Sequence, residues 1–115
     1  MQDYTFYCDD PEARRLSAAY ASRGVWSGGH LLLPQQAARA FIDDAQAAGL
    51  VVLGMDFWKQ FDTGRGEMGI NSVDCSSMLG RPDVVEQAAA FARQVISGGL
   101  PDGAQWVAFT LHRRA

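Results

Sequence analysis

The chain has few of the residues that mark secreted or metal-binding proteins. Among its 115 residues there are two cysteines, Cys8 and Cys75, which lack the close pairing of a metal or redox site. We expect both to be reduced, buried thiols, with a disulfide as the alternative. No HExxH, His-x-x-x-His or glycine-rich phosphate-binding pattern is present, so we expect no metal and no other cofactor.

Positive charge and long apolar segments are also scarce. Lys59 is the only lysine, the net charge is -3 and the pI is about 5.1. Because phosphate contacts need a basic face, this balance argues against nucleic-acid binding. No apolar run approaches membrane-spanning length, and the first ten residues lack the basic-then-apolar pattern of a signal peptide. The sequence predicts a soluble, cytoplasmic protein with no nucleic-acid or membrane partner.

What the chain does contain is an ordinary globular composition, at a length that predicts one domain over residues 1–115. Its central feature is the run LVVLGMDFW, from Leu50 to Trp58. Such a nearly unbroken apolar run predicts a strand covered on both faces. Asp56 interrupts the run, and a carboxylate there needs a partner, a hydrogen bond or solvent. Asp56 is therefore the first candidate site residue.

Helical and strand patterns surround this strand. Helices are predicted from Pro11 to about residue 23, from Pro34 to about residue 48 and from Pro82 to residue 97, each followed by glycine. Strands are predicted at 4–8, 30–33, 50–58, 67–75 and 104–112, with a turn-rich connection over 25–29 and a hairpin connection over 60–66. We expect the stripe Val84, Ala88, Phe91 and Val95 to be buried, and Trp26 and Trp106 to lie in the core. The order predicts an α+β two-layer sandwich, with a mixed or mostly antiparallel sheet of four to five strands and three helices.

Catalytic chemistry has little support in the sequence. The only histidines are His30 and His112, and no Gly-x-Ser-x-Gly motif is present. His112 belongs to a basic tail and is expected to be solvated. A cleft that joins His30 to Asp56 would make the chain a small enzyme or a small-molecule-binding domain, which is the alternative hypothesis. We predict no catalytic residue and no enzymatic activity.

The end of the central strand and the hairpin after it combine aromatic and charged side chains. Protein-binding surfaces favour this combination, because aromatic rings supply desolvated anchors and charges set specificity. The structural alternative is that Trp58 and Phe61 are core residues and that the charges form a solvated rim. The sequence favours neither interpretation for the two rings.

The stretch GHLLLPQQAARAFIDDAQAAGLVVLGMDFWK resembles the immunity protein 40 family of bacterial polymorphic toxin systems. In that family an amphipathic helix leads through a glycine to an apolar strand of the type ILGGDVY. Gly54, Asp56 and the aromatic pair at 57–58 carry the match, and the later helix and last strand follow in the same order over about residues 25–112. Two positions depart from the pattern: Met55 replaces the second glycine, and residues 69–74 lack the family's tryptophan.

The resemblance implies a non-enzymatic antitoxin that binds a cognate secreted toxin domain one to one. An acidic protein suits this role, because many toxin domains are basic and charge complementarity speeds association. We expect a monomer or weak dimer; an oligomerisation module that pairs through a strand edge is a third hypothesis. The expected partner-binding residues are Asp56, Trp58, Lys59, Gln60, Asp62, Glu67 and Asp74.

Overall fold

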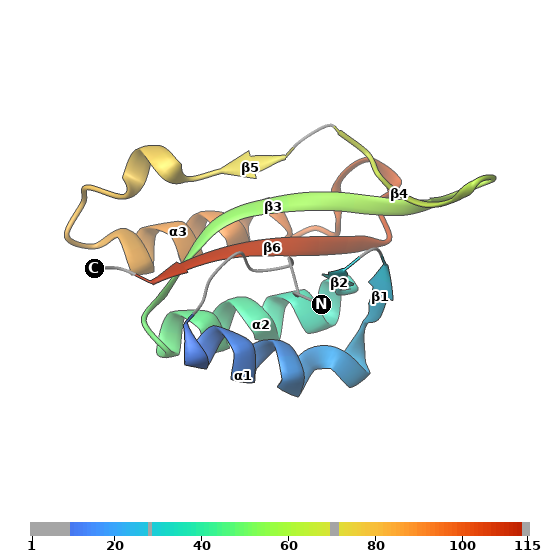
Figure 1. Cartoon of the computed structure of the whole chain (residues 1–115). Helices are drawn as coiled ribbons and strands as arrows, with labels where there is room; N and C mark the ends of the chain where they lie inside the picture. The colour runs from blue at the N-terminus through green and yellow to red at the C-terminus, as the bar shows by residue number, and fades with distance from the viewer. Residues whose placement is uncertain (1–9, 28, 70–71, 114–115) are drawn as a thin grey trace.

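In the part of the chain that the structure describes, three α-helices and two antiparallel sheets form an α+β fold, as the sequence predicts (Figure 1). The computed structural model describes residues 10–27, 29–69 and 72–113. The predicted strand over residues 4–8, with Cys8, lies outside them. The elements are α1 (Pro11–Tyr20), β1 (Val25–Ser27), β2 (His30–Leu32), α2 (Gln35–Ala47), β3 (Leu50–Phe61), β4 (Gly64–Glu67), β5 (Val73–Asp74), α3 (Val84–Val95) and β6 (Trp106–Arg113), with short 3-10 turns after α1, β5 and α3. Among the described residues, none of the helices combines the length and the apolar character needed to cross a bilayer.

The twelve-residue strand β3 is the central strand of the larger sheet. β6 runs antiparallel along one edge of β3, beside residues 50–58. On the other edge, β5 pairs with the middle of β3 and β4 pairs with its far end. One extra residue, Leu53, lies between the paired positions Val52 and Gly54 and forms a β-bulge. β3 therefore contacts every other strand of its sheet.

The smaller sheet is the hairpin of β1 and β2, which is joined to the larger sheet at one point. Backbone hydrogen bonds in both directions, 2.9 and 2.8 Å long, connect Leu33 to Val107 of β6. The sequence predicts only a turn over 25–29, but residues 25–27 form a strand because β2 supplies hydrogen-bonding partners. Trp26 of this edge strand is 43% exposed, so the prediction that it lies in the core is wrong.

Helices α2 and α3 pack against β3 and against each other, while α1 packs on α2 (Figure 1). Phe41 of α2 stacks on Phe109 of β6, with ring centroids 4.8 Å apart, and meets Tyr20 of α1 edge-on at 5.2 Å. Residues from β3 and β6 join this core through Val52, Met55, Phe57, Val107, Phe109 and Leu111. The helices thus cover one face of the larger sheet.

Helix α3 buries a stripe that agrees only in part with the predicted one, because Val84 and Ala88 are buried as expected and Phe91 is not. Its buried residues are Val84, Val85, Ala88, Ala89 and Ala92. Phe91, which we expected inside, is 42% exposed. The small alanine side chains let the helix approach the sheet along their own stripe, which turns Phe91 outward.

Arg113, near the end of β6, connects three elements. Its guanidinium donates to both carboxylate oxygens of Asp10 at 2.9 Å, to Glu12 of α1, and to the carbonyl oxygen of Ala48 at 2.7 Å. Asp10 also caps α1 by accepting hydrogen bonds from the backbone N–H groups of Glu12 and Ala13. The Arg113 guanidinium holds the pKa of Asp10 down at about 2, with the backbone N–H bonds acting in the same direction.

Candidate functional site

The face of the larger sheet turned away from the helices carries most of the candidate residues. In β3, Met55 and Phe57 point into the helical core. Successive strand residues point to opposite faces, so Gly54, Asp56 and Trp58 lie on the other side. Residues paired across strands share a face. We call this surface the open face; it is formed by Gly54, Asp56 and Trp58 of β3, Glu67 of β4, Asp74 of β5, and Trp106, Ala108 and Thr110 of β6.

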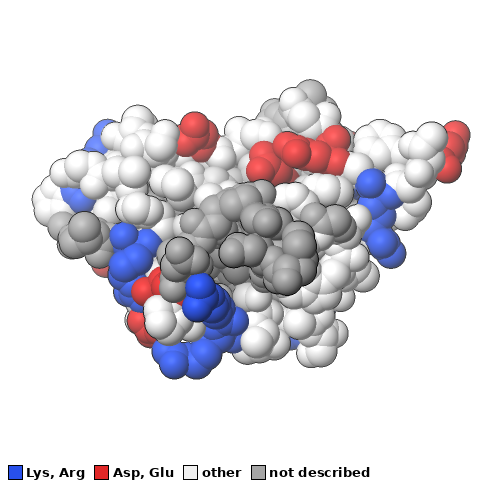
Figure 2. Space-filling model, in the orientation of Figure 1, with Lys and Arg blue, Asp and Glu red and all other residues white. Residues whose placement is uncertain are grey.

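Strand register brings three carboxyl groups to the open face. Glu67 lies opposite Trp58, and Asp74 lies opposite Gly54, so the two acids flank Asp56 along β3. Figure 2 shows acidic side chains gathered over the region of β3 and β5. Burial, and then the charge and the hydrogen bond of Asp56, raise the pKa of Glu67 above its ordinary value. Asp56 and Glu67 therefore form a pair of neighbouring carboxyl groups, and the charge of Asp56 opposes ionisation of Glu67.

Asp74 is in a different electrostatic state from Glu67. Its carboxylate accepts a hydrogen bond from the backbone N–H of Ser76 at 2.9 Å, and the pKa of Asp74 is lowered by its hydrogen bonds to Ser76. Asp74 is consequently ionised at neutral pH. Behind it lies Cys75, a buried free thiol whose pKa is raised, first by burial and then by the charge of Asp74. A thiol in that state is a poor nucleophile, so Cys75 serves as a small core residue.

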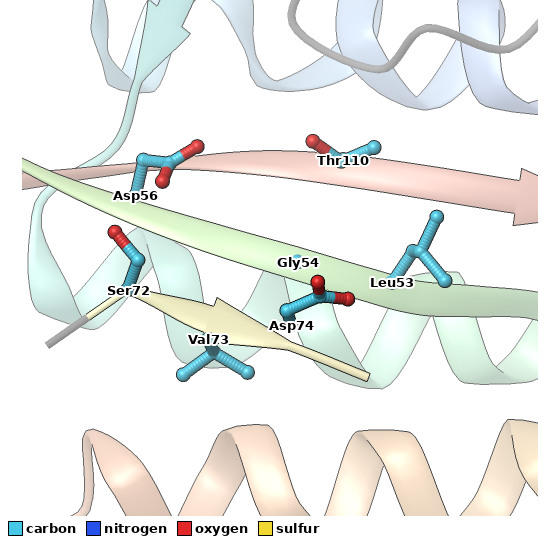
Figure 3. Close-up of a pocket in the computed structure, with 7 residues that line it drawn as sticks. All are labelled: Leu53, Gly54, Asp56, Ser72, Val73, Asp74 and Thr110. Carbon is cyan, nitrogen blue, oxygen red and sulfur yellow. The ribbon is translucent and has the colours of Figure 1, made fainter. Parts of the chain in front are cut away.

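A shallow depression of about 320 Å³ lies beside these carboxylates. It is lined by Leu53, Gly54, Asp56, Ser72, Val73, Asp74 and Thr110 (Figure 3). Figure 3 shows the carboxylates of Asp56 and Asp74 on either side of Gly54, while the side chain of Val73 points toward α3. A Cβ atom at position 54 would lie 3.0 Å from the carbonyl oxygen of Val73, so a larger residue would push β5 away from β3 by a few tenths of an ångström.

Aromatic rings occupy the open face next to the acidic residues. Trp58 and Trp106 are opposite each other across β3 and β6, and both are half-buried. The ring of His30 lies 5.3 Å from that of Trp58, and the guanidinium of Arg65 lies 5.6 Å from the ring centroid of Trp106. Within the part of the chain that the structure describes, the indole N–H of Trp58 is buried without a hydrogen-bond partner. Trp106 is thus only partly a core residue, contrary to expectation.

The predicted contact residues fall into two groups. Asp56, Trp58, Glu67 and Asp74 are together on the open face, and Gln60 continues this face along β3. Lys59 points to the opposite side of the strand, where its ammonium lies 5.4 Å from the centroid of the Phe61 ring. Asp62 lies at the turn between β3 and β4. Phe61 is 41% exposed, so the interpretation of this ring as a core residue is wrong.

This depression does not join Asp56 to His30, and the cleft of the alternative hypothesis stays a prediction. His30 packs beside Trp58 and is not among the residues that line the depression. No three His, Cys, Asp or Glu side chains within residues 10–27, 29–69 and 72–113 are grouped so as to bind a metal ion. Sequence reasoning missed the contributions of Thr110 and Ser72 to the depression. The alternation within β6 indicates that Trp106 and Thr110 share a face, but only the strand register shows that they lie beside β3.

Comparisons with known proteins give no relative on which to base a function. No protein-family model matches the chain, and no curated protein or solved structure matches it.

Proposed function

We propose that the protein is an immunity protein, a non-enzymatic inhibitor that binds a cognate secreted toxin domain in the cytoplasm. The open face would form a one-to-one interface with that domain, and the free protein would be a monomer or weak dimer. The resemblance of residues 25–112 to immunity protein 40 sequences supports this proposal. Glu67 and Asp74, two of the acidic residues on this face, are exposed.

The observation that carries the proposal is the meeting of acidic and aromatic side chains on one sheet face. Burial first, and then the charge of Asp56, raise the pKa of Glu67, so the two carboxyl groups carry a mutual repulsion when both are ionised. A cation supplied by a partner would remove it, so the surface favours a basic partner. Trp58 and Trp106 beside the acids are of the residue type that most often anchors protein interfaces.

The net charge of -3 acts at longer range. An acidic surface increases the rate at which a basic protein is encountered, and salt screens that attraction over about 8–10 Å at physiological ionic strength. The proposal therefore predicts an association rate that falls as salt is added, together with a dissociation rate that changes less.

The direct experiment uses the cognate toxin domain, which the proposal expects to be the C-terminal domain of a secreted protein encoded beside this gene. Titration calorimetry should give one-to-one binding with a Kd below about 1 μM, a modest affinity for an interface of standard size. Asp56→Lys should weaken that binding by roughly 30-fold or more, as expected for a charge at the centre of an interface. Glu86→Lys, at an exposed position of α3, is the matched control because it changes the net charge equally.

Two outcomes would contradict the proposal. The first is a lack of binding by the folded wild-type protein at about 10 μM, where even a Kd near 1 μM gives extensive complex formation. The second is an equal loss of affinity in Asp56→Lys and Glu86→Lys, because net charge alone would then explain the effect.

A further inference from the structure

The far end of β3 continues beyond the rest of the sheet. β6 pairs with β3 only as far as Trp58, and from there to Phe61 β4 is the partner of β3. Figure 1 shows this hairpin projecting past the helical layer. At about 3.4 Å per residue, Phe61 lies roughly 10 Å beyond Trp58. We call residues 59–66 the arm.

The arm exposes an aromatic side chain in water. Phe61 is 41% exposed, and its ring carbons lie 3.1 Å from where a Cβ atom of Gly66 would be, so one side of the ring covers that glycine. The ammonium of Lys59 lies near the same ring. The strands turn at Asp62 and Thr63. Helices α1, α2 and α3 all end short of the tip of this hairpin (Figure 1).

Two contacts fix the base of the arm to the body of the protein. The backbone N–H of Gln60 donates to the side-chain oxygen of Gln105 at 2.7 Å. On the other strand, Arg65 places its guanidinium over the ring of Trp106. These contacts hold the direction of the arm before any partner arrives, which reduces the entropy lost on binding.

Stability of the fold does not explain the arm. A two-stranded ribbon without a packed face is marginally stable by itself, and the buried residues of β3 end at Phe57. A twelve-residue strand is about twice the usual length. Shortening it to the end of β6 would remove an exposed phenylalanine and would leave the core unchanged.

We infer that the arm enters a concave cleft of the toxin domain and that Phe61 fills an apolar pocket inside it. This inference rests on the proposed function. Side chains project from both faces of the arm: Gln60 lies on the same side as the open face, whereas Lys59 and Phe61 point the opposite way. A flat partner on the open face would leave Phe61 in water, whereas a cleft covers both sides of a projecting ribbon. Occupation of that cleft is the way in which the protein would inhibit.

The test measures Kd for the same secreted C-terminal domain with two arm variants. One is Phe61→Ala. The other replaces residues 60–65 by Asn-Gly, which suits a two-residue hairpin turn between Lys59 and Gly66, already paired in the protein. Phe91→Ala is the matched control, because Phe91 is exposed to the same degree as Phe61 but lies on α3. Far-ultraviolet circular dichroism and the melting temperature establish that each variant is folded.

The inference predicts that both arm variants lose at least about tenfold in affinity, or roughly 1.4 kcal/mol, and that Phe91→Ala loses less than about threefold. Binding should also slow hydrogen exchange at the arm amides. A smaller loss in the arm variants, with Asp56→Lys still defective, overturns the cleft inference and leaves the proposed function standing. Failure of the wild-type protein to bind overturns both.

Discussion

At the scale of single residues, the open face contains two groups whose environments oppose folding. Glu67 is held against another carboxyl group, and the indole N–H of Trp58 is buried without an acceptor in the described part of the chain. A buried donor left unpaired costs about 1–3 kcal/mol. Both groups lie on the surface that we propose for binding, where a cost to stability is compatible with a functional role.

The pair of carboxyl groups predicts that Glu67→Gln raises the free energy of unfolding by an amount that depends on pH. Because the pKa of Glu67 is raised in the folded protein, its favourable contribution is complete below the ordinary glutamate pKa and is lost as pH rises through the folded value. Glu67→Gln should therefore stabilise the protein at pH 7 by up to about 1 kcal/mol, since the site is exposed, and hardly at pH 4. Urea unfolding at the two pH values measures this difference, with Glu86→Gln as the control. A Glu67→Gln protein less stable than wild type at pH 7 would refute the repulsion.

The buried indole N–H of Trp58, which has no acceptor among the described residues, predicts that replacing this tryptophan by phenylalanine costs little stability. Trp58→Phe removes the buried donor while keeping an aromatic ring beside His30, so the free energy of unfolding should change by less than about 1 kcal/mol. Trp106→Phe loses similar ring area without removing such a donor and should be the more destabilising of the two. Chemical denaturation of both variants decides the order, and the reverse order would mean that the Trp58 N–H has a partner in solution.

At the scale of elements, the core depends on the contact between α2 and β6. Phe41 is fully buried between Phe109 and Tyr20, whereas Phe91 of α3 is 42% exposed. The two phenylalanines have the same chemistry in opposite environments. They therefore allow burial to be separated from residue type.

Phe41→Ala should cost about 3–5 kcal/mol, because the lost transfer energy is increased by a cavity between helix and sheet. Phe91→Ala should cost less than about 1 kcal/mol, as surface substitutions usually do. The midpoints of urea unfolding curves provide the comparison. Similar costs for both changes would mean that α3 packs differently from the structure described above.

The elements themselves were largely predictable, and their pairing was not. The spacing of apolar residues, together with the prolines and glycines at the ends of segments, located helices α1, α2 and α3 and strands β2, β3 and β6 within a few residues. The polar residues after Trp58 suggested a loop, but β4 gives them hydrogen-bonding partners and extends β3 to Phe61. The alternation of side chains along β3 could have shown, from the sequence alone, that Lys59 and Asp56 point to opposite faces of the strand. Nothing local indicates that Glu67 and Asp74 lie beside Asp56, because that depends on cross-strand register.

At the scale of the whole molecule, Arg113 holds the last strand to the first described helix. Its guanidinium donates hydrogen bonds to Asp10, to Glu12 and to the carbonyl oxygen of Ala48, the residue that follows α2. These positions are far apart in the sequence, so the contact closes the helical layer against the end of β6. Loss of the Arg113 contact should reduce the cooperativity of unfolding more than loss of a contact within a single helix or strand.

The same contact predicts the acid sensitivity of the fold. The pKa of Asp10 is depressed to about 2, so its stabilising contribution is complete above the ordinary aspartate value and is lost as pH falls from about 4 through 2. Arg113→Met should lower stability at neutral pH and should flatten the fall in stability across that interval. Thermal melts from pH 5 to pH 2 provide the measurement, with Arg93→Met, which breaks an exposed ion pair to Asp43, as the comparison. An unchanged acid profile in Arg113→Met would contradict the assignment.

The bulge at Leu53 decides which side chains of β3 meet the solvent. On its N-terminal side, the even-numbered Leu50 and Val52 join the main core, while Val51 is buried in a second cluster with residues of α3; on its C-terminal side, the odd-numbered Met55 and Phe57 join the main core. One inserted residue therefore inverts the parity of the strand. Without that inversion, the two apolar residues would be presented to water and Asp56 would be driven under the helices, so the acidic surface exists because a single position has no counterpart in β6.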